Sequence, residues 1–167
     1  MEGYDFAAEI RVRFAETDAQ GVVHNSNYSV WFEVARVEFL ERFAGGYQRL
    51  RDLGVESFVL ESHARFIAPA VFDDRLLVHT RCLDIRGARF RFEYAIERAG
   101  EVIAEGWTAH ATVDSQTLRP TRIPGWLAEA IAPPGRPGPA SSRSSASSRS
   151  SASSRSSASS RSSASSS

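Results

Sequence analysis

The chain has 167 residues, of which 42% are hydrophobic and 10% aromatic, and its 20 arginines balance its 20 acidic residues without any lysine. All the acidic residues and 15 of the arginines precede residue 133, so this part carries a net charge of −5 and the remainder +5. The single cysteine, Cys82, excludes an intrachain disulfide, and no apolar run reaches the roughly 20 residues that span a bilayer. We expect a cytoplasmic protein, because the N-terminus also lacks the basic and apolar regions of a signal peptide.

The composition divides the chain into two parts. Residues 1–132 are mixed and rich in aromatic side chains, which predicts one domain with a modest core. Residues 133–167 begin with proline and glycine and continue with four copies of Ser-Ser-Arg-Ser-Ser-Ala, so we expect a disordered tail. Nucleic acid is an unlikely partner elsewhere, and only the arginines of this tail suggest binding to RNA or to an acidic surface. The alternative is an expanded repeat without a role.

The first predicted element is a strand over residues 8–14. Ala8, Ile10, Val12 and Phe14 alternate with charged residues, and a period of two is typical of a half-buried strand. We therefore expect these four side chains to share the buried face. Residues 15–26 then predict a loop, in which Gly21 supplies backbone freedom.

Residues 27–43 predict the main helix, which Ser26 or Asn27 can cap. Apolar residues occupy most of its circumference, so we expect this helix to be buried rather than to lie on a surface. Gly45 and Gly46 end it, and a second short helix is predicted over residues 47–53.

Four further strands are predicted, over residues 56–67, 75–85, 88–98 and 101–114, and a brief helix follows over residues 125–131. The last two strands are joined by a hairpin turn at Gly100. One long helix followed by strands with hairpin connections indicates an α+β fold. An antiparallel sheet curled around the long helix satisfies both patterns.

The most specific pattern lies in residues 13–36, where an acidic loop leads into a polar cluster and then into the long helix. Its distinctive residues are Asp18, Gly21, Asn27, Tyr28, Trp31, Phe32 and Glu33. This pattern resembles the signature of the 4-hydroxybenzoyl-CoA thioesterase family, and the resemblance extends over residues 8–131. It implies the hotdog fold, an acyl-CoA substrate, and a homodimer or homotetramer with active sites between subunits.

Hydrolysis of a thioester needs a nucleophile or base and a donor for the developing oxyanion. The resemblance assigns the catalytic carboxylate to Asp18; the alternative is an aspartate that only forms a turn or a cap. Amides at the helix N-terminus suit the oxyanion. Asn25 is a candidate for orienting water or the carbonyl group, and His24 is a candidate because it can titrate near neutral pH. Glu16 is expected at a strand end, facing solvent or paired with an arginine.

Substrate contacts are expected from three residues of the motif, Gly21, Asn27 and Tyr28. The phosphates of coenzyme A need cations. The candidates near the hairpin at Gly87 are Arg86, Arg89 and Arg91. The alternative for these arginines is a solvated strand face.

No cofactor and no metal site are expected. The four histidines, at positions 24, 63, 79 and 110, lack the spacing of zinc ligands. His63, His79 and His110 fall within strand patterns and are expected to be ordinary sheet residues. Cys82 has no catalytic motif beside it, so we expect a structural role.

The sequence therefore predicts an acyl-CoA thioesterase, which converts an acyl-CoA and water into a carboxylic acid and coenzyme A. Two alternatives remain open, namely an enoyl-thioester hydratase or dehydratase and a non-catalytic acyl-CoA sensor. The first generally needs an Asp-His pair, and the spacing from Asp18 to His24 does not fit it. The presence of Asp18 and the lack of a DNA-binding segment disfavour the sensor.

Deletion of residues 136–167 is expected to leave folding and hydrolysis nearly unchanged, because the tail has so little apolar surface to pack against the domain. Thermal melts, sizing and activity measurements on the full and shortened chains check this. A loss of several degrees in melting temperature, or of oligomerisation, would show that the tail docks. Binding to nucleic acid through the tail should instead weaken steeply with added salt, since bound arginines release counterions.

Overall fold

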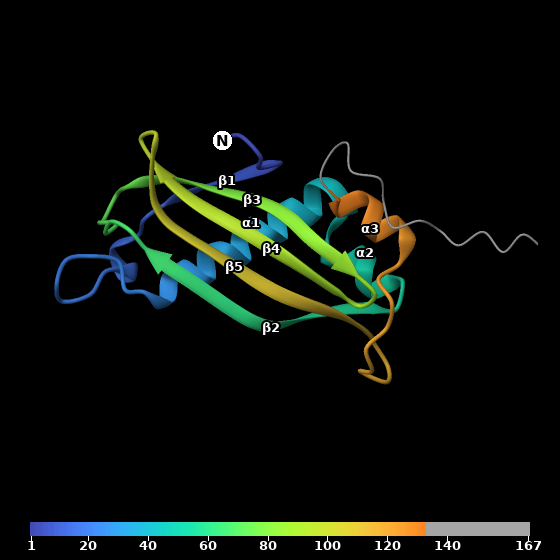
Figure 1. Ribbon diagram of the computed structural model, residues 1–167. Coiled ribbons are helices and arrows are strands. Elements are labelled where there is room, and N and C mark those ends of the chain that lie inside the picture. The colour runs from blue at the N-terminus through green and yellow to red at the C-terminus, as the bar shows by residue number, and fades with distance from the viewer. Residues whose placement is uncertain (133–167) are drawn as a thin grey trace, which may run out of the picture.

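The computed structural model describes residues 1–132, and the tail predicted to be disordered lies outside the described residues. The elements are, in chain order, β1 (Phe6–Arg11), η1 (Phe14–Glu16), α1 (Ser26–Ala44), α2 (Gly46–Asp52), β2 (Val55–Phe66), β3 (Arg75–Arg86), β4 (Arg89–Arg98), β5 (Glu101–Asp114) and α3 (Gly125–Ile131). The strands form one antiparallel sheet in the order β1-β3-β4-β5-β2, and α1 runs along one face of it (Figure 1). This confirms the predicted α+β hotdog arrangement. Within residues 1–132, no helix is long and apolar enough to cross a membrane.

The first strand ends earlier than its alternation predicted. After β1 the chain leaves the ladder with β3, and the N–H of Val12 donates instead to the carbonyl oxygen of Asp74 at 2.9 Å. The turn η1 follows at once and directs Phe14 outward, so this side chain is 76% exposed. The prediction that Phe14 shares the buried face was therefore wrong, because the turn interrupts the period of two.

One side of α1 is buried and the other is open. The side chains of α1 that pack against the sheet and are at most 2% exposed include Trp31, Phe32, Ala35 and Phe39. On the opposite side, Val30 and Val37 are 47% and 39% exposed. The expectation of a buried helix therefore holds for only part of its circumference in a single chain.

The hairpin between β4 and β5 confirms the predicted turn at Gly100. Ala99 and Gly100 both have positive φ values, 52° and 89°. Two consecutive residues with positive φ are what a tight hairpin turn requires. The turn pairs Arg98 of β4 with Glu101 of β5, and a β-bulge at Ile96 and Glu97 then shifts the register so that Tyr94 lies opposite Gly106.

The helix approaches the sheet closely at Phe32. Its ring stacks on Tyr94, with the centroids 4.4 Å apart and the planes 11° from parallel. A Cβ atom on Gly106 would lie 2.5 Å from the Phe32 ring and 2.6 Å from the carbonyl oxygen of His63 on β2. Glycine at this position of β5 therefore lets α1 lie deep against the sheet.

Gly106→Ala is expected to lower the free energy of unfolding by about 1–3 kcal/mol, the usual cost of overpacking a core. Urea or thermal unfolding measures this loss. Gly125→Ala is the matched control, because nothing lies within 4 Å of a Cβ atom built there. Equal stability of the two variants would mean that α1 can move away from the sheet without cost.

Candidate active site

Asp18 lies in a tight turn between β1 and α1. Its N–H donates to the carbonyl oxygen of Val22 at 2.8 Å, and its own carbonyl oxygen accepts from the N–H of Gly21 at 2.9 Å. The carboxylate oxygen Oδ1 accepts from the N–H of Gln20 at 2.8 Å, whereas Oδ2 accepts no hydrogen bond from residues 1–132. The bond to Gln20 is one that a turn-forming aspartate makes. A base or nucleophile needs a free oxygen, so the turn leaves the Oδ2 atom of Asp18 available for either role.

Two antiparallel bridges hold this turn in place, one between Thr17 and Val23 and one between Val22 and Val71. In addition, the N–H of Val23 donates to the carbonyl oxygen of Ala70 at 2.9 Å. The Asp18 turn therefore lies against the segment that connects β2 to β3.

The start of α1 offers an unpaired amide. The N–H of Ser26 donates to Nδ1 of His24 at 3.3 Å. The N–H of Asn27 donates to the carbonyl oxygen of His24 at 3.0 Å, and that of Tyr28 to Asn25 at 3.3 Å. The N–H of Asn25 donates to no atom of the described residues. Because it lies at the positive end of the helix dipole, this amide suits a developing oxyanion.

A cavity of about 270 Å³ opens beside the start of α1. It is lined by Val22, Val23, Asn25, Tyr28, Phe66, Ile67, Ala68 and Pro69. Most of these residues are apolar, so the cavity suits an acyl group better than a charged group. No group of three or more His, Cys, Asp or Glu side chains that could hold a metal ion occurs in the part of the chain that the structure describes.

Tyr28 forms one wall of this cavity. Its ring lies between those of Trp31 and Phe66, at centroid distances of 4.9 and 4.8 Å. Its hydroxyl oxygen accepts from the N–H of Ala70 at 3.4 Å. Burial raises the pKa of Tyr28, so the hydroxyl group is neutral near pH 7.

Asn27 holds the loop rather than lining the cavity. Its side-chain amide donates to the carbonyl oxygens of Glu16 and His24, at 2.9 and 3.3 Å. His24 is exposed, and its Nδ1 atom lies 2.8 Å from the hydroxyl oxygen of Ser26. The structure thus brings Asn25 to the cavity, together with Tyr28, and gives the other two polar candidates of the motif local roles at the helix start.

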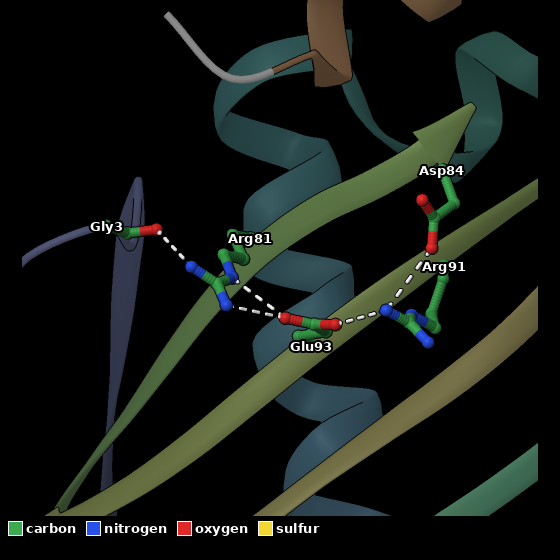
Figure 2. A network of polar contacts seen from close by, with 5 residues as sticks. All are labelled: Gly3, Arg81, Asp84, Arg91 and Glu93. Atoms are coloured by element: carbon green, nitrogen blue, oxygen red, sulfur yellow. Dashed lines mark hydrogen bonds and ion pairs between the residues drawn. The ribbon is translucent and has the colours of Figure 1, made fainter.

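The arginines predicted to bind phosphates lie at the other end of the sheet (Figure 1). β3 begins beside the cavity at Arg75 and ends eleven residues later at Arg86. An extended strand of that length spans about 36 Å. Arg91 is engaged on the face turned away from α1, where Nη2 lies 2.6 Å from Glu93 and 3.2 Å from Asp84 (Figure 2). Arg86 and Arg89 face each other across the hairpin. One chain therefore cannot bring this cluster to its own cavity, and a second subunit would have to supply it.

Sequence reasoning missed the burial of Glu16. As expected it pairs with an arginine, Arg13, but its side chain is only 5% exposed. Its carboxylate also accepts from the indole N–H of Trp31 at 3.2 Å. The sequence contained a signal for this contact, because a buried tryptophan usually needs an acceptor.

The chain is similar in sequence and in fold to known thioesterases. Residues 12–131 match the family described as the thioesterase-like superfamily. The acyl-CoA thioesterase YbgC of Haemophilus influenzae is 31% identical over 120 residues, which are 71% of this chain and 88% of the relative. A crystal structure from Thermus thermophilus has 40% identity and a TM-score of 0.72, and the match covers 76% of this chain and 97% of that one. The structure of Slr0204, a 1,4-dihydroxy-2-naphthoyl-CoA thioesterase from Synechocystis, has 25% identity and a TM-score of 0.71, with 79% and 98% covered.

Proposed function

The chain belongs to the thioesterase-like superfamily, and we propose that it hydrolyses acyl-CoA thioesters to a carboxylic acid and coenzyme A. The observation that carries the proposal is the unpaired N–H of Asn25 at the start of α1, in a residue that lines an apolar cavity and follows the Asp18 turn in the chain. Two relatives support the substrate class, since one is named an acyl-CoA thioesterase and the other a 1,4-dihydroxy-2-naphthoyl-CoA thioesterase.

In the proposed reaction, the thioester carbonyl oxygen accepts a hydrogen bond from the N–H of Asn25. Negative charge develops on this oxygen as the carbonyl carbon becomes tetrahedral, and the amide and the helix dipole stabilise it. Asn25 lines the cavity, and in this proposal its side chain orients water or the carbonyl group. The acyl group occupies the apolar space beside Tyr28.

The free Oδ2 atom of Asp18 acts in one of two ways. As a general base it takes a proton from water while the water oxygen bonds to the carbonyl carbon; the C–S bond then breaks, and the leaving thiolate takes up the proton. As a nucleophile it bonds to the carbon and expels the thiolate, and water then hydrolyses the resulting anhydride. Both routes use the same two groups, Asp18 and the Asn25 amide.

We also propose that two copies of the chain pair along β2. This strand lies at the edge of the sheet and, within residues 1–132, pairs only with β5, so the hydrogen-bonding groups on its other side have no strand partner in that part of the chain. The side chains in its middle, Phe58, Val59 and Leu60, are 45–49% exposed. Phe66, at the end of the same strand, lines the cavity, so a partner on β2 lies beside the site. The exposed valines of α1 offer a second contact, through which dimers can pair into tetramers.

A cytoplasmic location follows from the same proposal. Coenzyme A thioesters are made and used inside the cell. The thiol of Cys82 is fully buried, and burial raises its pKa, so it is an unreactive thiol suited to a reducing compartment.

Asp18→Asn is expected to lower the hydrolysis rate about 10²–10⁴-fold, because a carboxamide cannot take the proton or form the anhydride. Substrate binding should survive, since the change removes a negative charge near a polyanionic ligand. A panel of acetyl-CoA, butyryl-CoA, benzoyl-CoA and palmitoyl-CoA, followed by thiol release, provides the measurement.

Asp114→Asn is the matched control for this substitution. Asp114 is also a turn aspartate, and its Oδ1 atom accepts from the N–H groups of Gln116 and Thr117 at 3.1 and 2.7 Å. It should lose at least as much stability as the Asp18 variant, because the Asp114 carboxylate accepts more hydrogen bonds, but it should lose no activity. Equal, small losses of activity in both variants would mean that Asp18 only forms a turn.

Leu60→Lys is expected to separate the subunits, because a charge in the middle of β2 opposes pairing along this edge. Sizing with light scattering should show a dimer or tetramer for the unaltered chain and a smaller species for the variant. Leu118→Lys is the control, since Leu118 is similarly exposed, at 58%, but lies outside the strands. An unaltered chain that is monomeric at micromolar concentration and still active would contradict the shared site.

A further inference from the structure

Glu16 is connected to three segments of the chain at once. Its Oε2 atom accepts from the N–H of Arg13 at 2.8 Å, and Oε1 accepts from the Arg13 guanidinium at 2.9 Å. The Oε1 atom also accepts from the indole N–H of Trp31, one turn and a half into α1, at 3.2 Å. The backbone carbonyl oxygen of Glu16 accepts from the N–H of His24 and from the side-chain amide of Asn27, both at 2.9 Å.

These contacts close the loop that carries the proposed chemistry. The bond from the N–H of His24 to the carbonyl oxygen of Glu16 closes the loop between these two residues, and the bridge between Thr17 and Val23 closes it a second time. Asp18 lies two residues after the first anchor, and Asn25 lies one residue after the second. The relative position of the Asp18 carboxylate and the Asn25 amide therefore depends on the bonds that Glu16 makes.

We propose that Glu16 is a positioning residue, whose buried carboxylate and carbonyl group hold the Asp18 turn against the start of α1 so that Asp18 and the Asn25 amide face one thioester. This inference rests on the proposed function and adds a residue to it. Misplacement of a reacting group by 1 Å can cost on the order of 10²-fold in rate, so a residue that fixes the loop affects the chemistry without touching the substrate.

A carboxylate suits this position better than a neutral amide. Three N–H donors converge on its two oxygens, and an ionised carboxylate is acceptor-only. Glutamine would offer one oxygen and one NH₂ group, so at least one donor of Arg13 or Trp31 would face another donor. Burial alone would raise the pKa of Glu16, but the hydrogen bonds from Arg13 and Trp31 hold it below its usual range, so the acceptor form persists at neutral pH.

The geometry also distinguishes positioning from direct catalysis by Glu16. Both of its oxygens are engaged, and the residue is only 4% exposed. Asp18 keeps one oxygen free, as described above. A group that acts on a water or a thioester needs such an oxygen, and Glu16 lacks it.

Glu16→Gln in the full chain is expected to lower kcat about 10–100-fold for the acyl-CoA of the panel that the unaltered protein hydrolyses fastest. KM should change less than kcat, because the cavity walls formed by Tyr28 and residues 66–69 are not part of this loop. The acid limb of the pH–rate profile should be retained, because the Asp18 carboxylate is unchanged in this variant. Glu97→Gln is the matched control: Glu97 is a half-buried glutamate paired with His79 at 2.9 Å, far from the loop in sequence, and its substitution should leave kcat unchanged.

Hydrogen exchange followed by mass spectrometry supplies a readout that does not depend on activity. In Glu16→Gln, amides of residues 17–25 should exchange faster than in the unaltered chain, whereas Glu97→Gln should leave them unchanged. If Glu16→Gln does not fold, Trp31→Phe tests the same idea, because it removes the indole donor and keeps an aromatic ring at this buried position. It should show the same local increase with a smaller loss of kcat, about 3–10-fold.

The outcomes separate the two proposals. A Glu16→Gln variant with unchanged kcat, or with unchanged exchange in residues 17–25, overturns the positioning role and leaves the proposed function intact. Loss of the acid limb in Glu16→Gln, with full activity in Asp18→Asn, would make Glu16 the catalytic carboxylate and also overturn its positioning role. If the unaltered protein hydrolyses no member of the panel, the proposed function fails, and the exchange measurement still decides whether Glu16 fixes the loop.

Discussion

The depth at which α1 lies against the sheet depends on the contact between the Phe32 ring and the bare backbone of Gly106. Any side chain on β5 at this point would push the helix outward. Tyr28, which forms a wall of the cavity, lies one turn before Phe32 on the same helix, so its position follows from the same contact. The site is therefore coupled to the core through a single rigid helix, and the helix start cannot shift without disturbing the aromatic stack.

A buried polar cluster fixes the rotation of α1 about its axis. Arg36 is 6% exposed and donates to the hydroxyl oxygens of Tyr47 and Tyr94, at 3.2 and 3.3 Å. The Tyr94 hydroxyl contacts Thr108, which in turn contacts His110, at 2.9 and 2.8 Å. Burial and the Arg36 charge lower the pKa of His110 to about 3, so this histidine is neutral beside the cation. A buried cation with only neutral partners is costly, but any other rotation of the helix would leave Arg36 without these acceptors.

Sequence patterns predicted which helices and strands form better than they predicted where these elements end. The alternation over residues 88–98 identified β4 and its buried face, because the strand has a neighbour on both sides and the extra residues of its two β-bulges lie on β3 and β5, which leaves its own period of two intact. The same reasoning failed at Phe14, where the ladder with β3 stops and a turn begins. His63, His79 and His110 lie in strands as expected. The burial of Glu16 was not predicted, because its indole partner lies 15 residues away and a charged residue near a strand end ordinarily faces solvent.

The candidate site divides into a local part and a part that depends on tertiary structure. The free oxygen of Asp18, the Asn25 amide and the contacts of Glu16 all come from residues 13–31, a stretch short enough for its pattern to identify it. The far wall of the cavity comes from residues 66–69, and no spacing in the sequence connects them to the loop. The arginines predicted to bind the coenzyme A phosphates are less local still, because they lie at the opposite end of the sheet. In the proposed reaction the groups that act on the thioester come from one short stretch of one chain, whereas these arginines could reach the same site only from a second subunit, for which the unpaired edge of β2 is the proposed contact.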